Sequence, residues 1–152
     1  MSQPPPDRYR SIDDGPPREL RVKGSRLLAL AWHADSEAEA LERLEPLRKR
    51  YHDATHHCWA LRCGPPEGCV ERHEDDGEPS GTAGMPILGA LRRVEVHDAM
   101  VVVTRYFGGT KLGTGGLVRA YGEAAALAVE AAPVREILRT AYLAFACQYE
   151  DL

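Results

Sequence analysis

The sequence predicts one soluble α/β domain, and three observations support this fold class. The chain has 152 residues, of which 43% are hydrophobic, and this is enough to build one folded core. Short apolar runs that are typical of strands alternate with segments that have helical spacing. Between residues 99 and 131, a strand, a glycine-rich loop and a helix follow one another directly.

The first 17 residues differ from the rest of the chain. They contain five prolines and no apolar stretch, so they lack the hydrophobic segment of a secretory signal. We expect residues 1–17 to form a disordered leader that is dispensable for folding. No run of about 18 apolar residues occurs, so we expect no membrane-spanning helix and a cytoplasmic location.

Apolar spacing and turn residues predict the elements in order. Lys23-Gly24-Ser25 separates two apolar runs, as in a hairpin. Ser36 and Glu39 form a capping box, which marks the start of a helix. The nearly unbroken apolar run over residues 99–107 is typical of a strand covered on both faces. The expected strands are a hairpin at 18–33 and single strands at 56–63, 99–107 and 140–149. The expected helices are one at 36–51 that is bent at Pro46, a short one that starts between residues 80 and 86 and ends at about residue 93, and one at 117–131.

Charge is unevenly distributed along the chain. The formal net charge is −4, which argues against a general nucleic-acid binder, because such proteins carry clustered lysines and arginines. Residues 99–122, however, contain three cations and no carboxylate, whereas residues 71–78 contain five carboxylates and one arginine. Local fields of this kind matter for binding even where the net charge says little.

The glycine-rich loop, residues 107–116, has the composition of an anion site. Its glycines permit positive φ, and the helix that follows supplies free N–H groups and a positive dipole end. Arg119 lies in the early turns of that helix, where the dipole disfavours a cation unless an anion is near. The alternative is a tight turn whose glycines only permit close packing. The loop has neither the G-K-[ST] of a Walker A motif nor the third glycine of a dinucleotide fingerprint.

Aromatic residues and cations flank the same loop. This combination is used for single-stranded RNA, where cations pair with phosphate and rings stack on bases. The alternative for Phe107 and Tyr121 is a place in the core. The predicted anion or RNA site comprises Arg105, Tyr106, Lys111, Gly113, Thr114, Gly115, Gly116, Arg119 and Tyr121.

The histidines and cysteines of residues 56–73 do not predict a metal site. On a regular strand, His56 and Cys58 face one side, whereas His57 and Cys63 face the other. No C-x-x-C pair occurs and no export signal is present, so the cysteines are expected to be reduced thiols. We therefore expect neither a metal nor another cofactor.

Three stretches together resemble one family. They are HHCWA at residues 56–60, DDGEPSGTAGxPIL at residues 75–88, and VVVxRYFGGxxLGxGGLVxAY at residues 101–121. The turn at residues 23–26 matches as well. On these residues the chain resembles the YigZ/IMPACT family over roughly residues 18–149.

The resemblance implies the fold of the second domain of small-subunit ribosomal protein five. This is an α+β two-layer sandwich with a mostly antiparallel sheet and helices on one face. Bacterial members usually carry a second, ferredoxin-like domain, and residues 142–149 resemble its opening strand. We therefore expect a leader at 1–17, the family's N-terminal domain at 18–135, and at 136–152 a final strand or the start of a truncated second domain.

Function follows from the same resemblance and from the loops. The eukaryotic IMPACT branch regulates translation under stress through protein partners, and many relatives of the implied fold bind RNA or phosphate. We interpret the chain as a non-enzymatic binding module in translation control. It would contact RNA, the ribosome or a translation-associated protein through the basic residues of the glycine-rich loop. The acidic residues Asp75, Asp76 and Glu78 would orient that site or contact a protein partner. We expect no membrane association and no specificity for DNA.

Two alternatives remain open. Residues 112–116 are similar to the phosphate loop of the kinases related to galactokinase and mevalonate kinase, which favours an enzyme acting on a small phosphorylated or nucleotide substrate. The other alternative is a purely protein–protein regulator that has no anion site.

Overall fold

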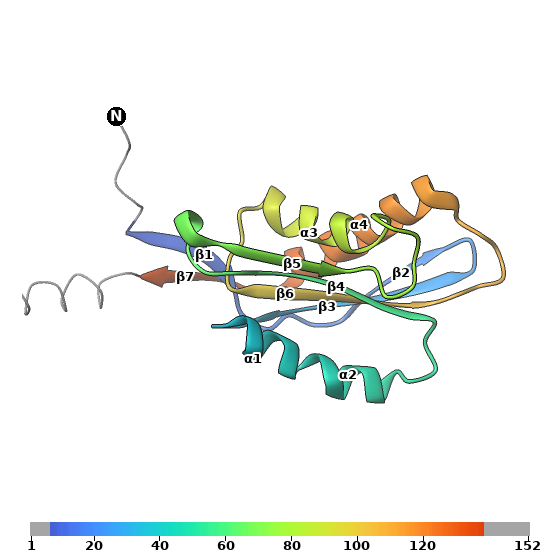
Figure 1. Cartoon of the computed structure of the whole chain (residues 1–152), viewed down its shortest axis with the longest axis horizontal. Coiled ribbons are helices and arrows are strands. Elements are labelled where there is room, and N and C mark those ends of the chain that lie inside the picture. The colour runs from blue at the N-terminus through green and yellow to red at the C-terminus, as the bar shows by residue number, and fades with distance from the viewer. Residues whose placement is uncertain (1–6, 139–152) are drawn as a thin grey trace, which may run out of the picture.

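The computed structural model describes residues 7–138, which form a five-stranded sheet, four α-helices and a separate two-stranded ribbon (Figure 1). The main sheet has the strand order β2-β3-β6-β4-β5, the ribbon pairs β1 with β7, and every pairing is antiparallel. The elements are β1 (Arg8–Ile12), β2 (Arg18–Val22), β3 (Ser25–His33), α1 (Glu37–Glu42), α2 (Leu44–Arg50), β4 (His56–Cys63), the 3-10 turn η1 (Pro66–Gly68), β5 (Val70–Glu74), α3 (Gly84–Arg93), β6 (Ala99–Tyr106), α4 (Gly113–Ala131) and β7 (Val134–Leu138).

The central strand β6 supplies side chains to two separate cores. Val101 and Val103 are buried in the larger core, against α3 and α4. Met100 and Val102 point to the opposite face, into a smaller core with α1 and α2. The alternation follows from the two-residue period of a strand. The prediction of a strand covered on both faces is confirmed.

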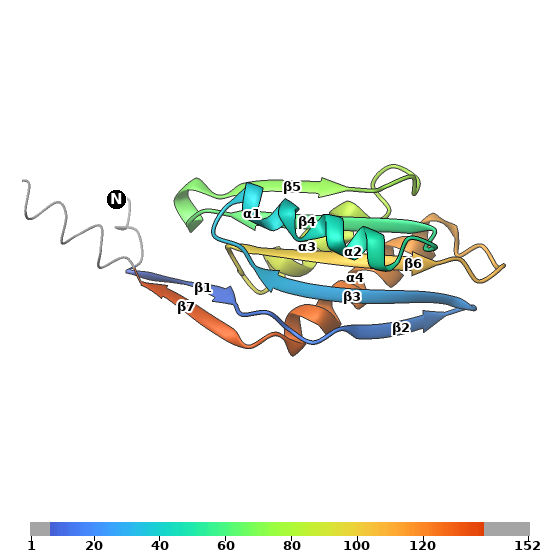
Figure 2. The ribbon, with the colours of Figure 1, turned by 90° about the horizontal axis from the view of Figure 1, so that it is seen from below.

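Helices cover both faces of the sheet, so the expectation of helices on one face only is wrong. Figure 2 shows α1 and α2 crossing the face of the sheet that lies opposite α3 and α4. The physical reason is the second apolar surface, in which Trp32 and Trp59 of the sheet are buried together with Leu44 of α2. The α/β class and the antiparallel sheet are confirmed.

The expected helix at 36–51 is in fact two short helices. Ser36 caps α1 as predicted, because its side chain accepts the N–H of Glu39 at 3.1 Å. The break lies at Arg43 rather than at Pro46. Pro46 occupies the first turn of α2, where the helix needs no hydrogen bond from a backbone N–H. In one continuous helix, its ring would clash with the carbonyl of Glu42.

The described part of the expected leader is ordered, which corrects that prediction. Residues 8–12 form β1, and Ile12 is 1% exposed within the larger core. The N–H of Gly15 then donates to the carbonyl of Ala31 at 3.0 Å. The strand escaped prediction because it has no run of apolar residues and its pairing partner, β7, is far away in the sequence. Residues 1–6 lie outside the described residues.

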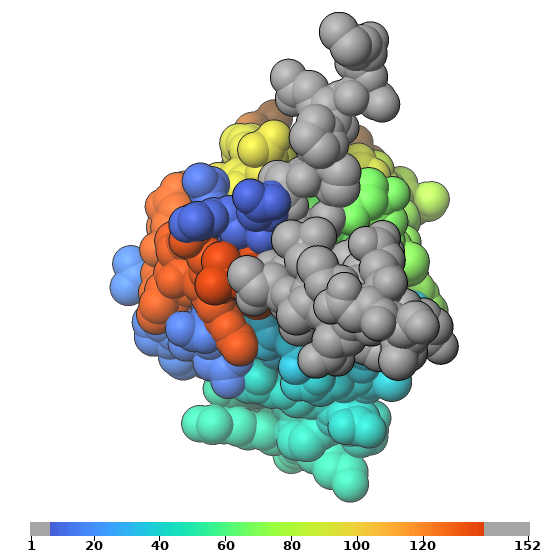
Figure 3. Space-filling view, turned by 90° about the vertical axis from the view of Figure 1, so that its left-hand side faces the viewer, coloured from blue at the N-terminus to red at the C-terminus, as the bar shows by residue number. Residues whose placement is uncertain are grey.

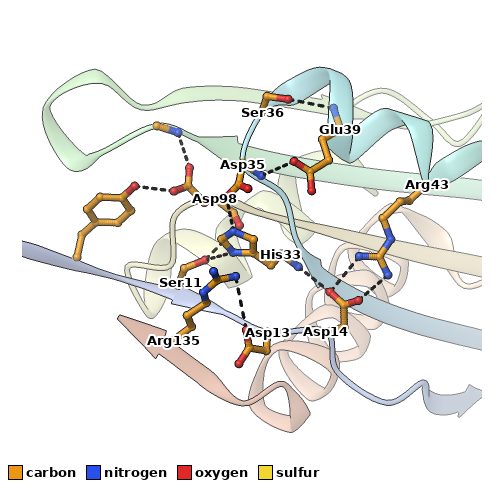
Figure 4. A network of polar contacts seen from close by, with 12 residues as sticks. Ser11, Asp13, Asp14, His33, Asp35, Ser36, Glu39, Arg43, Asp98 and Arg135 are labelled. Atoms are coloured by element: carbon orange, nitrogen blue, oxygen red, sulfur yellow. Dashed lines mark hydrogen bonds and ion pairs between the residues drawn. The ribbon is translucent and has the colours of Figure 1, made fainter. Parts of the chain in front are cut away.

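A polar network ties this segment to β3 and to the turn before β6 (Figure 4). The buried Ser11 hydroxyl donates to the carbonyl of Asp98 at 3.1 Å and lies 2.9 Å from Nδ1 of His33. Asp14 accepts the backbone N–H of His33 at 3.2 Å and pairs with Arg43 at 2.9 Å. The hydrogen bond from Arg43 lowers the pKa of Asp14, so its carboxylate stays ionised near neutral pH.

Three further elements differ from expectation. β5 overlaps the start of the acidic stretch. It escaped prediction because this exposed edge strand is rich in charge and lacks apolar alternation. α4 begins at Gly113, four residues earlier than expected. β7 crosses the expected boundary at residue 135, and the predicted strand at 140–149 lies outside the described residues. Among the described helices, none combines the length and apolar character needed to cross a membrane.

The ribbon generates a prediction about stability. Ile12→Ala removes a side chain that is fully buried, so we expect the free energy of unfolding to fall by about 2–5 kcal/mol. Arg8→Ala, on the same strand but exposed, should change it by less than about 0.5 kcal/mol. Urea unfolding measures both, and an Ile12→Ala variant as stable as the wild type would restore the leader interpretation.

Candidate functional site

The acidic loop (residues 75–83) and the glycine-rich loop lie at the same end of the sheet (Figures 1 and 2). The acidic loop connects β5 to α3, and the glycine-rich loop connects β6 to α4. The last four residues of the glycine-rich loop form the first turn of α4. This arrangement brings the basic and acidic elements to the same end of the sheet.

Glu78 joins the two loops, and it is buried with only 8% of its surface exposed. Its Oε2 accepts hydrogen bonds from Nη1 of Arg105 at 2.8 Å and from the hydroxyl of Tyr121. Its Oε1 lies 3.2 Å from Nε2 of His56. These partners come from β6, α4 and β4, so a single carboxylate links the acidic loop to three elements.

Arg105 faces the interior instead of the surface. Only 4% of it is exposed, and its Nη2 donates to the Ser25 hydroxyl at 3.3 Å while Nη1 binds Glu78. Its Nε has no hydrogen-bond partner among the described residues, and the guanidinium lies 5.6 Å from the Phe107 ring centroid. The charge of Arg105 is therefore neutralised inside the protein by the carboxylate of Glu78.

Tyr121 and Cys58 are buried beside Glu78. Burial raises the pKa of the Tyr121 hydroxyl far above its ordinary value, and the neighbouring Cys58 adds to this effect. Burial likewise raises the pKa of the Cys58 thiol, whose Sγ donates to the carbonyl of Asp75 at 3.1 Å. Both groups are neutral near pH 7, so neither is an activated nucleophile. Tyr121 occupies the core, as one of its two interpretations expected, whereas 48% of Phe107 is exposed.

Asp75 closes the acidic loop on itself. Its carboxylate accepts the backbone N–H groups of Gly81, Ala83 and Gly84 at 2.9, 3.2 and 2.8 Å. Burial acts to raise the pKa of Asp75, but these three donors outweigh it and hold the pKa below its ordinary value. The ionised side chain thus fixes the approach to α3.

Asp76 connects the same loop to the start of β4. Its Oδ2 accepts the N–H of His57 at 2.7 Å, and its carbonyl lies 2.7 Å from Nδ1 of His56. Because Nε2 of His56 faces Glu78, both ring nitrogens lie within hydrogen-bond distance of an oxygen atom. All three carboxylates that were singled out in the sequence are therefore engaged by groups of this chain.

The glycines of the loop serve different purposes. A Cβ on Gly108 would lie 2.0 Å from the carbonyl carbon of Gly24, so close packing against the β2–β3 turn requires glycine there. Gly109 and Gly113 have φ values of +87° and +74°, and no described atom lies within 4 Å of the position that a Cβ would take, so their requirement is conformational. Gly115 faces the guanidinium of Arg119, with Nη1 3.5 Å from where a Cβ would be.

The exposed members of the predicted site surround the start of α4. Lys111, Thr114 and Arg119 are exposed, and no side chain of the described residues caps the helix at this end. Tyr106 is only partly buried, and its hydroxyl donates to Asp53 at 3.0 Å. The structure thus divides the set into an internal part, Arg105 with Tyr121, and a surface part around Lys111.

Sequence reasoning missed residues that contribute to this end of the molecule. Lys23 of the β2–β3 turn and Arg119 line one depression of about 280 Å³ beside α4. Ser25 and His56 bind the Glu78–Arg105 pair. The signal was present, because Lys23, Ser25 and His56 all lie in stretches that resemble the family, but sequence spacing does not show which distant residues they contact.

Ser11, His33 and Asp35 resemble a hydrolytic triad but cannot act as one. Nε2 of His33 lies 2.6 Å from Asp35, and Nδ1 lies 2.9 Å from the Ser11 hydroxyl. Ser11 has no exposed surface, and its hydroxyl donates to the Asp98 carbonyl. The contacts therefore hold β1 in place (Figure 4).

Comparison with known proteins identifies the chain's relatives. Residues 23–129 match the model of the Impact N-terminal domain. The chain belongs to the IMPACT family. It is 44% identical over 131 residues to the IMPACT family member in pol 5′ region of Thermus thermophilus, an alignment that covers 86% of this chain and 69% of that protein. The predicted family resemblance is confirmed.

Other relatives of this IMPACT-family chain are longer. IMPACT family member YvyE of Bacillus subtilis is 41% identical over 115 residues, which cover 76% of this chain and 52% of YvyE. The chain thus spans about half the length of this curated relative. A crystal structure described as that of a hypothetical protein has a TM-score of 0.83 and 34% identity, covering 87% of this chain and 65% of the other. The fold is therefore shared, while the likeness to ribosomal protein five stays a prediction.

The acidic loop generates a prediction about pH. In Asp75→Asn the ionised acceptor is lost, so we expect the free energy of unfolding at about pH 7 to fall by about 1–2 kcal/mol. Because the folded-state pKa of Asp75 is lowered, its contribution is present above the unfolded pKa and disappears as the pH falls through the folded pKa. The difference from wild type should therefore shrink below about pH 4.

Urea unfolding between about pH 7 and about pH 3 measures this difference. Glu74→Gln, an exposed carboxylate on the preceding strand, is the matched control and should follow the wild type. A difference for Asp75→Asn that is constant across this range would contradict the assigned role of the charge.

Proposed function

We propose that this IMPACT-family chain is a non-enzymatic binding module in translation control, which contacts the phosphate backbone of RNA through the surface part of the glycine-rich loop. One observation carries the proposal: Lys111 and Arg119 are exposed beside an uncapped helix start. Free N–H groups, a positive dipole end and two cations together attract a phosphate group.

The internal contacts support this proposal by giving the loop a defined shape. Glu78 holds Arg105 and Tyr121 inside, and Gly108 packs against Gly24. A loop that is held in place loses less conformational entropy when a ligand binds. Since Arg105 is neutralised internally, the phosphate contacts fall to Lys111 and Arg119, with Lys23 next to them.

A binding role is favoured over nucleophilic chemistry by the state of the buried groups. Cys58 and Tyr121 are buried with raised pKa values, and Ser11 is inaccessible. The link to translation comes from family membership, because the eukaryotic IMPACT branch that the sequence resembles regulates translation under stress. Function depends on the site and not on the fold alone, so the binding step is tested first.

Titration of a short single-stranded RNA at several salt concentrations tests the proposal. We expect weak binding that falls steeply with salt, because each neutralised phosphate releases counterions. Lys111→Ala and Arg119→Ala should each weaken binding and flatten the salt slope by about one unit. Lys49→Ala, which removes another exposed cation on α2 across the sheet, should behave like the wild type.

Two results would contradict the proposal. One is the absence of RNA binding by the folded wild-type protein at low salt. The other is equal binding by all three variants. Either result would favour the alternative of a regulator that contacts only proteins.

A further inference from the structure

A second cluster of cations lies at the other end of the molecule, beside the β1–β7 ribbon. Figures 1 and 2 place this ribbon at the end of the sheet opposite the glycine-rich loop, and Figure 3 faces it. Here a pocket of about 550 Å³ is lined by four arginines, Arg8, Arg10, Arg62 and Arg92, which outnumber its two carboxylates, Glu95 and Glu136. We call it the arginine pocket. Its volume is within the range of small-molecule sites, and its cations contrast with the net charge of −4.

A shared carboxylate holds two of these arginines in fixed positions. Glu71 accepts Nε of Arg62 at 3.0 Å, and it accepts Nε and Nη2 of Arg92 at 2.8 and 2.6 Å. Arg62 also donates to the Val96 carbonyl at 3.1 Å, and only 13% of its side chain is exposed. The two guanidinium groups are thus positioned before any ligand arrives, which lowers the entropic cost of binding.

The ribbon supplies the opposite wall. Arg10 donates through Nη1 to the Val94 carbonyl at 2.8 Å, and Arg8 pairs with Glu136 at 3.2 Å. Each guanidinium has three nitrogens, and one or two of them donate to carboxylates and carbonyls of the described residues. Every arginine of the pocket therefore keeps at least one nitrogen for another acceptor.

Two aromatic rings and one residue with a positive φ also line the pocket. The rings of Tyr9 and His97 meet edge to face with centroids 5.7 Å apart. Burial lowers the pKa of His97, so this ring is neutral near pH 7 and adds no charge of its own. Glu95, which lines the pocket, has a φ of +54°, and non-glycine residues with such a backbone conformation are often found at binding sites.

We propose that the arginine pocket binds a small ligand that carries a phosphate or pyrophosphate group. Guanidinium groups match phosphate oxygens in pairs, and three or more converging on one pocket favour a dianion or a more highly charged group. Arg10, Arg62 and Arg92 bind the phosphate oxygens, with the ribbon as one side of the site. This site is separate from the proposed RNA contact and does not depend on it.

Isothermal titration of the full chain with inorganic pyrophosphate at low ionic strength tests the site. We expect saturable binding of one pyrophosphate per chain. Arg10→Gln and Arg92→Gln should each weaken it about tenfold, the effect of losing a charged hydrogen bond. Arg93→Gln, an exposed arginine next to Arg92 that does not line the pocket, is the matched control and should bind like the wild type.

Variants of the other end of the molecule separate the two proposals. Lys111→Ala and Arg119→Ala should leave pyrophosphate binding unchanged, even if they abolish RNA binding. Circular dichroism confirms that each variant is folded. The site is refuted if the wild type does not bind pyrophosphate, if Arg10→Gln and Arg92→Gln bind as well as Arg93→Gln, or if the glycine-loop variants lose the binding instead.

Discussion

The buried carboxylate of Glu78 is the contact on which the candidate site depends. It neutralises Arg105, accepts a hydrogen bond from Tyr121 and lies within reach of His56. A buried charge is costly unless it is paired, so each of these groups requires the others. These contacts fix the acidic loop, the end of β6 and the first turns of α4 relative to one another. The exposed cations of the glycine-rich loop lie on this fixed framework.

The two ends of the molecule have different physical characters. At one end, charges are compensated inside and the cations that remain, Lys111 and Arg119, lie at the surface beside a helix start. At the other end, Glu71 and the ribbon hold several arginines around a pocket. The matched family region, residues 23–129, contains the whole of the first site, whereas Arg8 and Arg10 of the second precede it. The ribbon therefore lies outside the matched family region.

Much of the fold could be predicted because it depends on local patterns. Three local patterns predicted their elements correctly: the apolar run of β6, the turn at Lys23–Ser25 and the capping box of α1. β5 could not be predicted in this way, because a charged, exposed strand has no apolar period. β1 could not be predicted either, because it is short and polar and pairs with β7, which is far away in the sequence. The contacts of the site could not be predicted from local pattern either. Glu78 and Arg105 are 27 residues apart, and their residue types suggested two surface charges. In the structure both are buried, and they form one internal ion pair.

A double-mutant cycle on Glu78 and Arg105 tests the central claim most directly. Urea unfolding would be measured for Glu78→Ala, Arg105→Ala and the double variant, with Glu74→Ala as an exposed control. Each single substitution should cost about 3–5 kcal/mol, because it leaves a buried charge without its partner. The double variant should cost less than the sum of the two by at least about 1 kcal/mol, while the control changes stability by less than about 0.5 kcal/mol. Additive effects, or single variants as stable as the control, would show that this pair does not hold the two loops together.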